Sequence, residues 1–409
     1  MLLINIKSLF GTHPNSVVLR GAQLSNLPVI HNAYLQIKHG IISDFGPMEE
    51  LGKVSEEEDM YDATGKTVIP SFCDSHSHIV FAGSREEEFV DKIKGLSYAD
   101  IAAKGGGILN SALKLGNTSE DDLYEQALTR VQQVMKTGTG ALEIKSGYGL
   151  NTASELKMLR VIKRLKKAVP IPIKATFLGA HAYPKKYKDD HEGYIKLIIN
   201  EMLPAIAEEN LADYIDVFCE KGFFDQESSA KILKAGAKYG LKAKIHANQL
   251  NNSGGVQVGI HHDALSVDHL ETLGKEEIEL LGKSKTMATL LPSAAFFLRM
   301  SYPPARELIN AGAAVALATD YNPGSSPSGN IPLLLSLACI QMKMTPEEAI
   351  NAVTLNGACA MELEEEVGSI QIGKRANIIL TQNIPSLAYL PYAFGSNTIN
   401  KVMANGQWI

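Results

Sequence analysis

Two histidines stand one residue apart at the end of the stretch FCDSHSH, just after an apolar run. Side chains alternate along an extended strand, so His76 and His78 share one face and can reach one metal ion together. A single pair with this spacing is a weak signal of a site. Three further polar residues, however, follow apolar runs later in the chain: His246 in KIHANQ, His269 in SVDHLE and Asp320 in LATDYNPGSS.

These residue types predict metal-dependent hydrolytic chemistry. Imidazole and carboxylate groups bind zinc and iron, and a site with fewer protein ligands than the ion accepts keeps room for water. The ion lowers the pKa of bound water, and a carboxylate such as Asp320 can both hold the metal and take the proton of that water. We expect His269 to be a further ligand, or an orienting base or electrophile beside the substrate.

The apolar runs predict eight buried strands, with amphipathic or charged helical segments between most of them. Nearly continuous β-branched runs are typical of parallel strands that are buried on both faces. Eight such strands with crossover helices predict an α/β fold of the (β/α)8 TIM-barrel type, whose active site forms at the C-terminal ends of the strands. An open doubly wound sheet is the alternative. The expected strands lie at 67–75, 138–145, 171–179, 214–219, 241–246, 264–268, 286–291 and 313–319.

Both ends of the chain have a different character from the middle. They show the alternating pattern and glycine turns of hairpins, as in KHGIISDFG around Gly40 and in the last strands around Gly406. We therefore expect a small β-sandwich-like domain built from residues 1–65 and 360–409. The metal-dependent barrel is expected to span residues 66–359.

Two connecting segments carry local expectations of their own. The region 79–135 is too long for one crossover, so we expect it to carry a loop over the active face. After the last barrel strand, the stretch TPEEAINAV predicts a helix start. Thr345 is the expected N-cap, Pro346 takes the first helical position and Glu348 closes a capping box.

Composition narrows the class of protein. A chain of 409 residues with 45% hydrophobic residues can bury a large core without disulfides. The net charge of −6 and the single Trp argue against a nucleic-acid-binding protein. No apolar run of 18 residues and no signal-peptide pattern is present, so we expect no membrane segment and a cytoplasmic location. The four cysteines form no CxxC pair and are expected to be free thiols.

The quoted stretches, with β segments at both ends, resemble the amidohydrolase superfamily over essentially the whole chain. The motifs HIVFAGSREEEF, GGGI, LEIKSGYGL, LGAHAYP and IHANQ are more specific and are similar to those of the imidazolonepropionase family. This resemblance implies hydrolysis of a small molecule, 4-imidazolone-5-propanoate, to N-formimidoyl-L-glutamate in the third step of histidine degradation. It also implies one zinc or iron ion per subunit and a homodimer.

The resemblance implies roles at the site as well. The implied metal ligands are His76, His78, His246 and Asp320. The metal-activated water attacks the ring, and Asp320 takes its proton and can pass it to the leaving nitrogen. His269 assists or stabilises the developing negative charge, and Gln249 orients the ring. Asp320, His269 and Gln249 are therefore the expected catalytic residues.

The same resemblance implies which residues hold the substrate and the open product. The implied substrate contacts are Arg85, Tyr148, His181, Gln249 and Ser325. Tyr148, Asn322 and Gly324 are expected to contact the product. The planar fork of donors on Arg85 suits the propanoate carboxylate. The NPGS turn that begins at Asn322 is expected to offer backbone N–H groups to an anion.

Other readings stay open at the level of sequence. Lys145 ends the second expected strand, close to where superfamily members with two metals carry a carboxylated lysine. The adjacent SGYGL favours an ordinary lysine and one ion. A Schiff base on Lys145 would instead make the protein an aldolase-type lyase. Another cyclic-amide or nucleobase amidohydrolase or deaminase is the nearer alternative. The presence of all four implied ligands argues against a non-catalytic scaffold.

Overall fold

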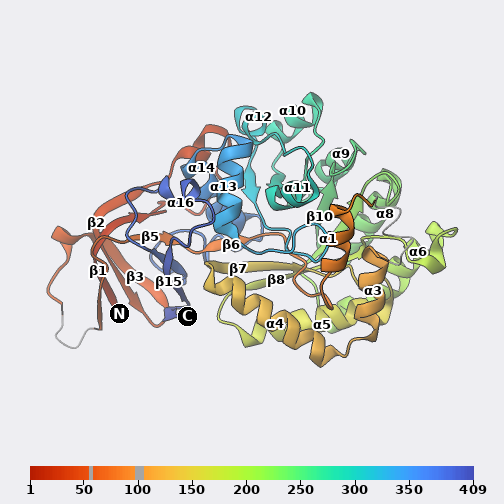
Figure 1. Cartoon of the computed structure of the whole chain (residues 1–409), viewed down its shortest axis with the longest axis horizontal. Helices are drawn as coiled ribbons and strands as arrows, with labels where there is room; N and C mark the ends of the chain where they lie inside the picture. Colours follow the sequence, from red (N-terminus) through yellow and green to blue (C-terminus); the bar gives the residue numbers. More distant parts are fainter. Residues whose placement is uncertain (55–58, 97–105) are drawn as a thin grey trace.

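The structure is a computed structural model that describes residues 1–54, 59–96 and 106–409. Its described part consists of a barrel of parallel strands surrounded by helices, and a second sheet that lies beside the barrel (Figure 1). The GGGI motif begins at Gly105, which lies outside the described residues. So does part of the region 79–135 that was expected to cover the active face.

The barrel sheet contains eight strands in chain order, each parallel to the next. These strands are β6 (Phe72–Asp74), β7 (Thr139–Lys145), β8 (Ile173–Ala180), β9 (Tyr214–Cys219), β10 (Lys242–Ala247), β11 (Ser266–His269), β12 (Met287–Leu290) and β13 (Val315–Leu317). Asp320 N–H donates to His76 O, and His78 N–H donates to Tyr321 O, both at 2.9 Å. These bonds join the segments that follow the first and last strands, and the predicted barrel is confirmed.

The second sheet combines strands from the two ends of the chain, as predicted. Its strands are β1 (Leu2–Phe10), β2 (Val29–Lys38), β3 (Ile41–Pro47), β4 (Met60–Asp62), β5 (Thr67–Pro70), β14 (Ile378–Thr381), β15 (Ile399–Ala404) and β16 (Gln407–Trp408). Their order is β16-β15-β14-β5-β1-β2-β3, with β4 paired to β1, so both termini lie in this sheet (Figure 1). The domain boundaries at 65/66 and 359/360 stay a prediction.

The expected strand 67–75 is in fact two strands that belong to different sheets. β5 pairs with β1 and β14, whereas β6 pairs with β7. Between them, Ser71 N–H donates to Asn377 O at 2.9 Å, and the next residue, Phe72, donates to Gly138 O at 2.8 Å. The partner therefore changes within one residue of a continuous apolar run, and hydrophobic patterning does not show such a change.

Helices cover the outside of the barrel and line its mouth. They are α1 (Glu86–Ile93), α3 (Ile108–Asn117), α4 (Glu120–Lys136), α5 (Thr152–Ala168), α6 (His191–Leu197), α7 (Leu203–Glu209), α8 (Gln226–Ala237), α9 (Gly255–His261), α10 (Lys275–Lys283), α11 (Pro292–Leu298), α12 (Ala305–Asn310), α13 (Ile331–Met342), α14 (Pro346–Val353), α15 (Leu355–Cys359) and α16 (Tyr389–Tyr392), with shorter turns η1 (Gly21–Ser25), η2 (Met48–Glu50), η3 (Lys185–Tyr187) and η4 (Ile198–Met202).

Several helix ends are specified by nearby residues. Ser119 caps α4, because its Oγ accepts Asp122 N–H at 3.0 Å, and three acidic residues occupy the first turn, which the helix dipole favours. The predicted capping box of α14 is present: Thr345 Oγ accepts Glu348 N–H at 3.3 Å and Glu348 accepts Thr345 N–H at 2.7 Å. Pro346 takes the first helical position, as expected.

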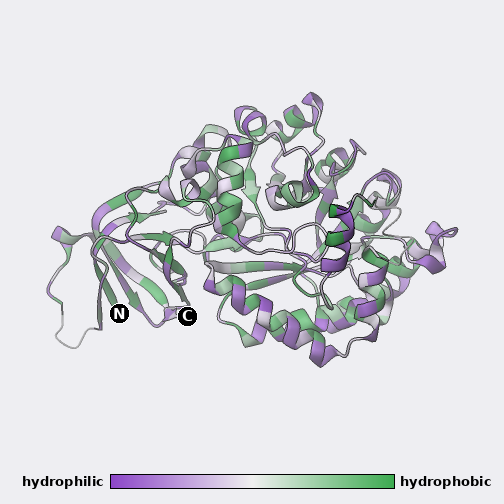
Figure 2. Ribbon diagram, viewed as in Figure 1, coloured by the Kyte–Doolittle hydropathy of each residue, from purple (hydrophilic) through white to green (hydrophobic). Residues whose placement is uncertain are grey.

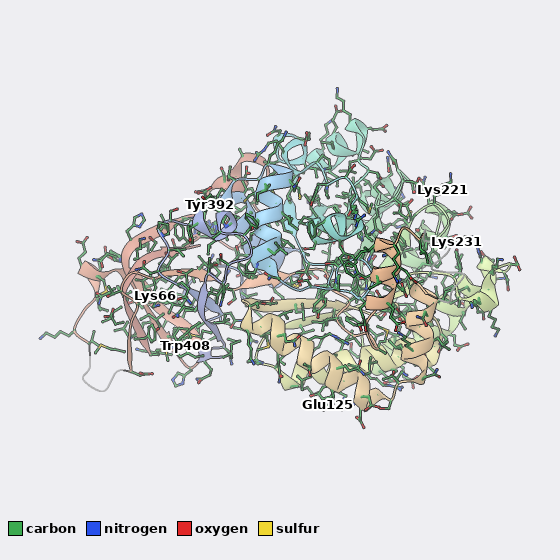
Figure 3. The ribbon with its side chains drawn as sticks, viewed as in Figure 1. Lys66, Glu125, Lys221, Lys231, Tyr392 and Trp408 are labelled. Carbon is green, nitrogen blue, oxygen red and sulfur yellow. The ribbon has the colours of Figure 1, made fainter. Side chains whose placement is uncertain are left out.

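Hydrophobic residues fill the barrel and the inner faces of its helices. Figure 2 shows green, hydrophobic residues in the barrel strands, and purple, hydrophilic residues on the outer faces of α4 and α5. Exposed charged side chains such as Glu125 on α4 and Lys231 on α8 point away from the barrel (Figure 3). Among the described residues, no helix has both the length and the apolar character needed to cross a bilayer.

Candidate active site

The polar residues predicted from the strand ends converge inside the barrel mouth. His78 Nε2 lies 3.2 Å from His76 Nε2 and 3.4 Å from His246 Nε2. Asp320 Oδ1 lies 3.6 Å from His76 Nε2 and 3.5 Å from His78 Nε2. All four side chains are buried. Four potential ligand atoms from three separate parts of the chain therefore face one point.

The local backbone explains this convergence. His246 belongs to β10 and His269 ends β11, while His76 and His78 lie in an extended segment that continues from β6. Two of the residues adopt left-handed backbone angles, with φ of +86° at His269 and +52° at Asp320. Such angles are unfavourable for residues other than glycine and persist where the surrounding structure holds them, often at functional sites.

Hydrogen bonds on the far side of the imidazoles set their tautomers. His76 Nδ1 donates to Asp268 Oδ2 at 2.6 Å, and His246 Nδ1 donates to Asp216 Oδ2 at 3.0 Å. Each Nε2 therefore keeps its lone pair. Burial, and then the nearby Lys145 ammonium, lower the pKa of His76 well below its ordinary value, so its imidazole is neutral. Neutral imidazoles and a carboxylate that point at one centre fit a divalent metal ion.

A cavity of about 800 Å³ opens onto these ligand atoms. Every sequence-predicted site residue except His76 lines it, and His76 lies beneath it against His78. A largely apolar cavity with a few polar groups is typical of small-molecule sites. Its wall also includes residues that the sequence analysis did not single out, among them Phe89, Lys92, Phe218, Phe297 and Arg299.

One wall of the cavity is aromatic. The rings of His78 and His181 stack with centroids 5.4 Å apart, and the Tyr148 ring lies 5.5 Å from that of His181. His181 Nδ1 donates to Gly147 O at 3.0 Å. Burial, and then the neighbouring His246, lower the pKa of His181 to about 3. His181 is therefore neutral, and its Nε2 can accept a hydrogen bond from a bound molecule.

The loop after β13 differs in one respect from the anion-binding turn that was expected. Asn322 Oδ1 accepts hydrogen bonds from the backbone N–H groups of Gly324 at 2.7 Å and Ser325 at 2.8 Å, so both groups already have partners. Ser325 Oγ donates instead to Asp320 Oδ2 at 3.0 Å and orients that carboxylate. Arg85 packs against the same loop, since a Cβ on Gly324 would lie 2.3 Å from Arg85 Nη1.

His269 has a buried acidic partner. Its Nδ1 lies 3.2 Å from Glu271 Oε1, and both side chains are buried. Burial alone would lower the pKa of His269, but the charge and hydrogen bond of Glu271 outweigh it and raise that pKa. His269 is thus suited to carry a proton beside the cavity. Gln249 lies two residues beyond β10 and lines the cavity.

Lys145 is locked among carboxylates inside the barrel. Its Nζ donates to Glu143 Oε1 at 2.6 Å and to Asp216 Oδ2 at 2.8 Å. Burial would lower the pKa of Lys145, but Asp216, Glu143 and Asp268 outweigh it and raise that pKa. A Schiff base or a carbamate forms on a neutral amine, and this lysine stays charged. The geometry agrees with the ordinary lysine expected from sequence and argues against a lyase.

Sequence reasoning missed the acidic residues behind the histidines. Asp216 and Asp268 lie inside apolar strands, in YIDVF and SVDH, and Glu271 follows the second of these strands. A carboxylate within an otherwise apolar barrel strand is unusual unless it has a buried partner, and this was a usable signal. Glu88 was missed for another reason: it is one of three consecutive glutamates, and their spacing does not show which one turns inward.

Comparisons with known proteins identify the family. The profile of the amidohydrolase family matches residues 67–409. The chain is 54% identical to an imidazolonepropionase of Christiangramia forsetii, with 100% of both chains covered. It is 55% identical to an imidazolonepropionase of Flavobacterium johnsoniae, with 100% of this chain and 99% of the relative covered.

Solved structures support the same fold at much lower identity. An atrazine chlorohydrolase from Arthrobacter aurescens TC1, solved with zinc, superposes with a TM-score of 0.75 at 15% identity, covering 100% of this chain and 94% of the other. The predicted resemblance is thus confirmed by full-length relatives, and the predicted barrel by solved structures. The chain belongs to the amidohydrolase family and, within that family, to the imidazolonepropionases.

Proposed function

We propose that this chain hydrolyses 4-imidazolone-5-propanoate to N-formimidoyl-L-glutamate, a step of histidine degradation. The observation that carries the proposal is the meeting of His76, His78, His246 and Asp320 at the inner end of a cavity whose wall holds Arg85. This arrangement places a proposed metal site and a cationic group in one cavity. The full-length relatives named imidazolonepropionase support the same substrate.

The same four residues would hold one zinc or iron ion per subunit. Their donor set suits both metals, and an atrazine chlorohydrolase of the same fold was solved with zinc. When bound, such an ion acidifies a water molecule and polarises the carbonyl that is attacked. Metal analysis of protein purified without chelator distinguishes zinc from iron and gives the stoichiometry.

The side chains of the cavity wall bind and orient the substrate. Arg85 offers guanidinium donors to the propanoate carboxylate. Tyr148 contributes a hydroxyl, and His181, which is neutral, accepts a hydrogen bond from the ring. Asn322 and Gly324, in the loop after β13, contact the opened product together with Tyr148, and Ser325 of the same loop contacts the substrate. Together these groups discriminate in favour of a ring that carries an acidic side chain.

Asp320 carries out the proton transfers, and His269 assists at the inner end of the cavity. Asp320 takes a proton from the attacking water as oxygen bonds to the ring carbonyl carbon, and Ser325 holds the other carboxylate oxygen. The proton then passes to the ring nitrogen as its bond to that carbon breaks. His269, whose pKa is raised by its pairing with Glu271, stabilises the negative charge that develops on the carbonyl oxygen. Gln249 orients the ring.

One experiment tests the proposed reaction. The purified protein, loaded with zinc or iron, is incubated with 4-imidazolone-5-propanoate, and imidazolone absorbance, N-formimidoyl-L-glutamate and ammonia are followed together. We expect absorbance to fall as formimidoylglutamate appears in equal amount, without ammonia. His78→Ala serves as the inactive reference. Ammonia release without formimidoylglutamate would instead support a deaminase.

The deaminase or other cyclic-amide hydrolase is the weaker candidate. Solved structures of the barrel family share the fold with this chain at low identity, and a shared fold alone does not specify a substrate. Arg85 favours an acidic side chain on the substrate, which a nucleobase lacks.

Two properties of the protein in the cell belong to the same proposal. A cytoplasmic location is supported by the free state of the four cysteines, of which Cys73 and Cys219 are buried. A homodimer is supported by the family resemblance. Light scattering coupled to size-exclusion chromatography measures the oligomeric state, and a monomer mass would contradict the dimer.

A further inference from the structure

Arg85, the N-cap residue of helix α1, lines the cavity, and its acidic partner Glu88 lies one turn later on the same helix. Arg85 Nε and Nη2 both donate to one oxygen of Glu88, Oε2, at 2.9 and 2.6 Å. The two side chains are only 11% and 12% exposed. A pair at this spacing on an open helix surface contributes little, but a partly buried, doubly bonded arginine has a fixed guanidinium plane.

Nη1, the guanidinium nitrogen that does not bond to Glu88, lies against the loop that lines the cavity. Arg85 Nη1 makes no hydrogen bond to any residue that the structure describes. It lies against Gly324, where an added Cβ would come within 2.3 Å of it, and Gly324 lines the same cavity as Asp320. Because Nε and Nη2 already donate to Glu88, Nη1 is the guanidinium nitrogen that is left to donate to a substrate.

Glu88 is itself held from a second direction. Its other oxygen, Oε1, accepts the backbone N–H of Gly107 at 3.0 Å, at the start of α3. Burial raises the pKa of Glu88, but the hydrogen bond and charge of Arg85 outweigh it, and the pKa is lowered. The carboxylate thus stays ionised and joins the N-cap residue of α1 to the N-cap residue of α3.

We infer that Glu88 is a positioning residue that fixes Arg85 so that Nη1 meets the propanoate carboxylate of the substrate. The inference rests on the proposed function, because it concerns how that substrate is bound. Glu88 does not touch the substrate in this account. It reduces the conformational entropy that the long arginine side chain loses on binding. It therefore raises the affinity for substrates with an acidic side chain.

Two effects of Glu88 oppose each other, and they predict opposite results. As a fixed anion near the site it repels the substrate carboxylate, so its removal would lower KM. As the residue that orders Arg85 it favours binding, so its removal would raise KM. Because Glu88 already shares its charge with Nε and Nη2, the ordering effect is expected to dominate.

The test uses the metal-loaded full chain with four variants: Glu88→Ala, Glu88→Gln, Arg85→Ala and the Arg85→Ala/Glu88→Ala double variant. We expect Glu88→Ala to raise KM about five- to tenfold with kcat changed less than twofold. Glu88→Gln keeps an oxygen for Arg85 and should give a smaller rise. In the Arg85→Ala background, Glu88→Ala should add nothing, because the two residues act as one unit.

A matched control and a matched substrate separate this role from a merely structural one. Glu87 is exposed on the same helix, and Glu87→Gln should leave KM and kcat unchanged. A substrate analogue with an amide in place of the carboxylate should react equally well with the wild-type chain and with Glu88→Ala. If Glu88→Ala fails to fold, Glu88→Gln provides the same comparison.

Several results would overturn the inference. These are a KM that falls or stays constant in both Glu88 variants, an undiminished effect of Glu88→Ala without Arg85, or an equal loss with the amide analogue. Failure of the proposed function is a separate outcome, because the wild-type chain would then not open 4-imidazolone-5-propanoate at all.

Discussion

Carboxylates behind two imidazoles of the site set the tautomer in which Nε2 can bind a metal. Asp268 and Asp216 each accept the Nδ1 hydrogen of one histidine, so the lone pairs of His76 and His246 point to the common centre. A carboxylate behind a ligand also raises its basicity toward a metal. We therefore expect the affinity of the proposed site for metal to depend on residues that are not ligands themselves.

Asp268→Asn tests this dependence at a single residue. The substitution keeps the shape of the side chain but removes the charge that His76 Nδ1–H meets at 2.6 Å. We expect the affinity of the metal-free protein for zinc to fall about 10- to 100-fold. Competition with a chromophoric chelator measures that affinity without recourse to enzyme activity.

The control for this prediction is Asp263→Asn, at an exposed position in the turn after α9. Its zinc affinity should equal that of the wild-type chain. An Asp268→Asn protein that binds zinc as tightly as the wild type would show that the carboxylate is dispensable to the ligand.

The strands of the barrel position the site through a buried layer of charges. β7 contributes Glu143 and Lys145, β9 contributes Asp216 and β10 contributes Lys244, all fully buried or nearly so. Lys145 bonds to both acidic residues, and Lys244 pairs with Glu143. Ion pairs therefore join β7 to β9 and to β10, strands that are not its neighbours in the sheet, and Asp216 of this layer also bonds to His246, a proposed metal ligand.

Lys145→Met tests this layer at the level of the strands. The variant leaves Glu143 and Asp216 buried without the ammonium that they contact at 2.6 and 2.8 Å. Removal of one partner from a buried ion pair costs about 3–5 kcal/mol, so we expect the free energy of unfolding to fall by about that amount. Urea denaturation of the metal-free protein measures the change.

An exposed lysine provides the comparison for this change. Lys167→Met removes the same charge from the surface of α5 and should shift the free energy of unfolding by less than about 0.5 kcal/mol. If Lys145→Met proved as stable as Lys167→Met, the charge layer would contribute nothing to the barrel.

The strands were the part of the fold that sequence could predict well. All eight barrel strands lie within a few residues of their expected positions. β-branched apolar runs between helical segments are typical of parallel strands that are buried on both faces. The exception is the run 67–75, where patterning indicates a strand but not which sheet it joins. The chain passes from one sheet to the other between Ser71 and Phe72. The backbone N–H of Ser71 bonds to Asn377, which lies over three hundred residues away in the chain, so local patterning does not reveal the switch.

The convergence of the strand-end residues at the candidate site could be predicted from sequence, but the side chains that hold those residues in place could not. His76, His246 and Asp320 end apolar runs, and parallel strands bring such ends together. The partners of these residues depend on which side chains face inward across neighbouring strands. Asp268 and Glu88 therefore became evident only from the packed structure, as did the bonds that Asn322 makes within its own loop.

At the scale of the whole molecule, the terminal sheet and the barrel are joined around one asparagine. Asn377 precedes β14, and its Nδ2 donates to Gly140 O in β7 at 2.8 Å. Its Oδ1 accepts Asn405 N–H at 2.6 Å, in the turn between β15 and β16. Its backbone oxygen accepts the Ser71 N–H between β5 and β6. Asn377 thus contacts the barrel, the turn between β15 and β16, and the junction between β5 and β6.

This junction predicts that the two parts unfold together. Trp408 is the single tryptophan and lies in β16, so its fluorescence reports the terminal sheet, while zinc would bind in the barrel. Zinc added to the metal-free chain should raise the urea midpoint seen by Trp408 as much as that seen by far-UV circular dichroism, because a native-state ligand stabilises everything that unfolds with its site.

Asn377→Ala leaves Gly140 O and a backbone N–H without partners. We expect it to reduce stability by about 1–3 kcal/mol and to separate the two midpoints. Asn400→Ala, at an exposed position of β15, should leave them coincident. A Trp408 midpoint that does not respond to zinc in the unsubstituted chain would show that the sheet unfolds independently of the barrel.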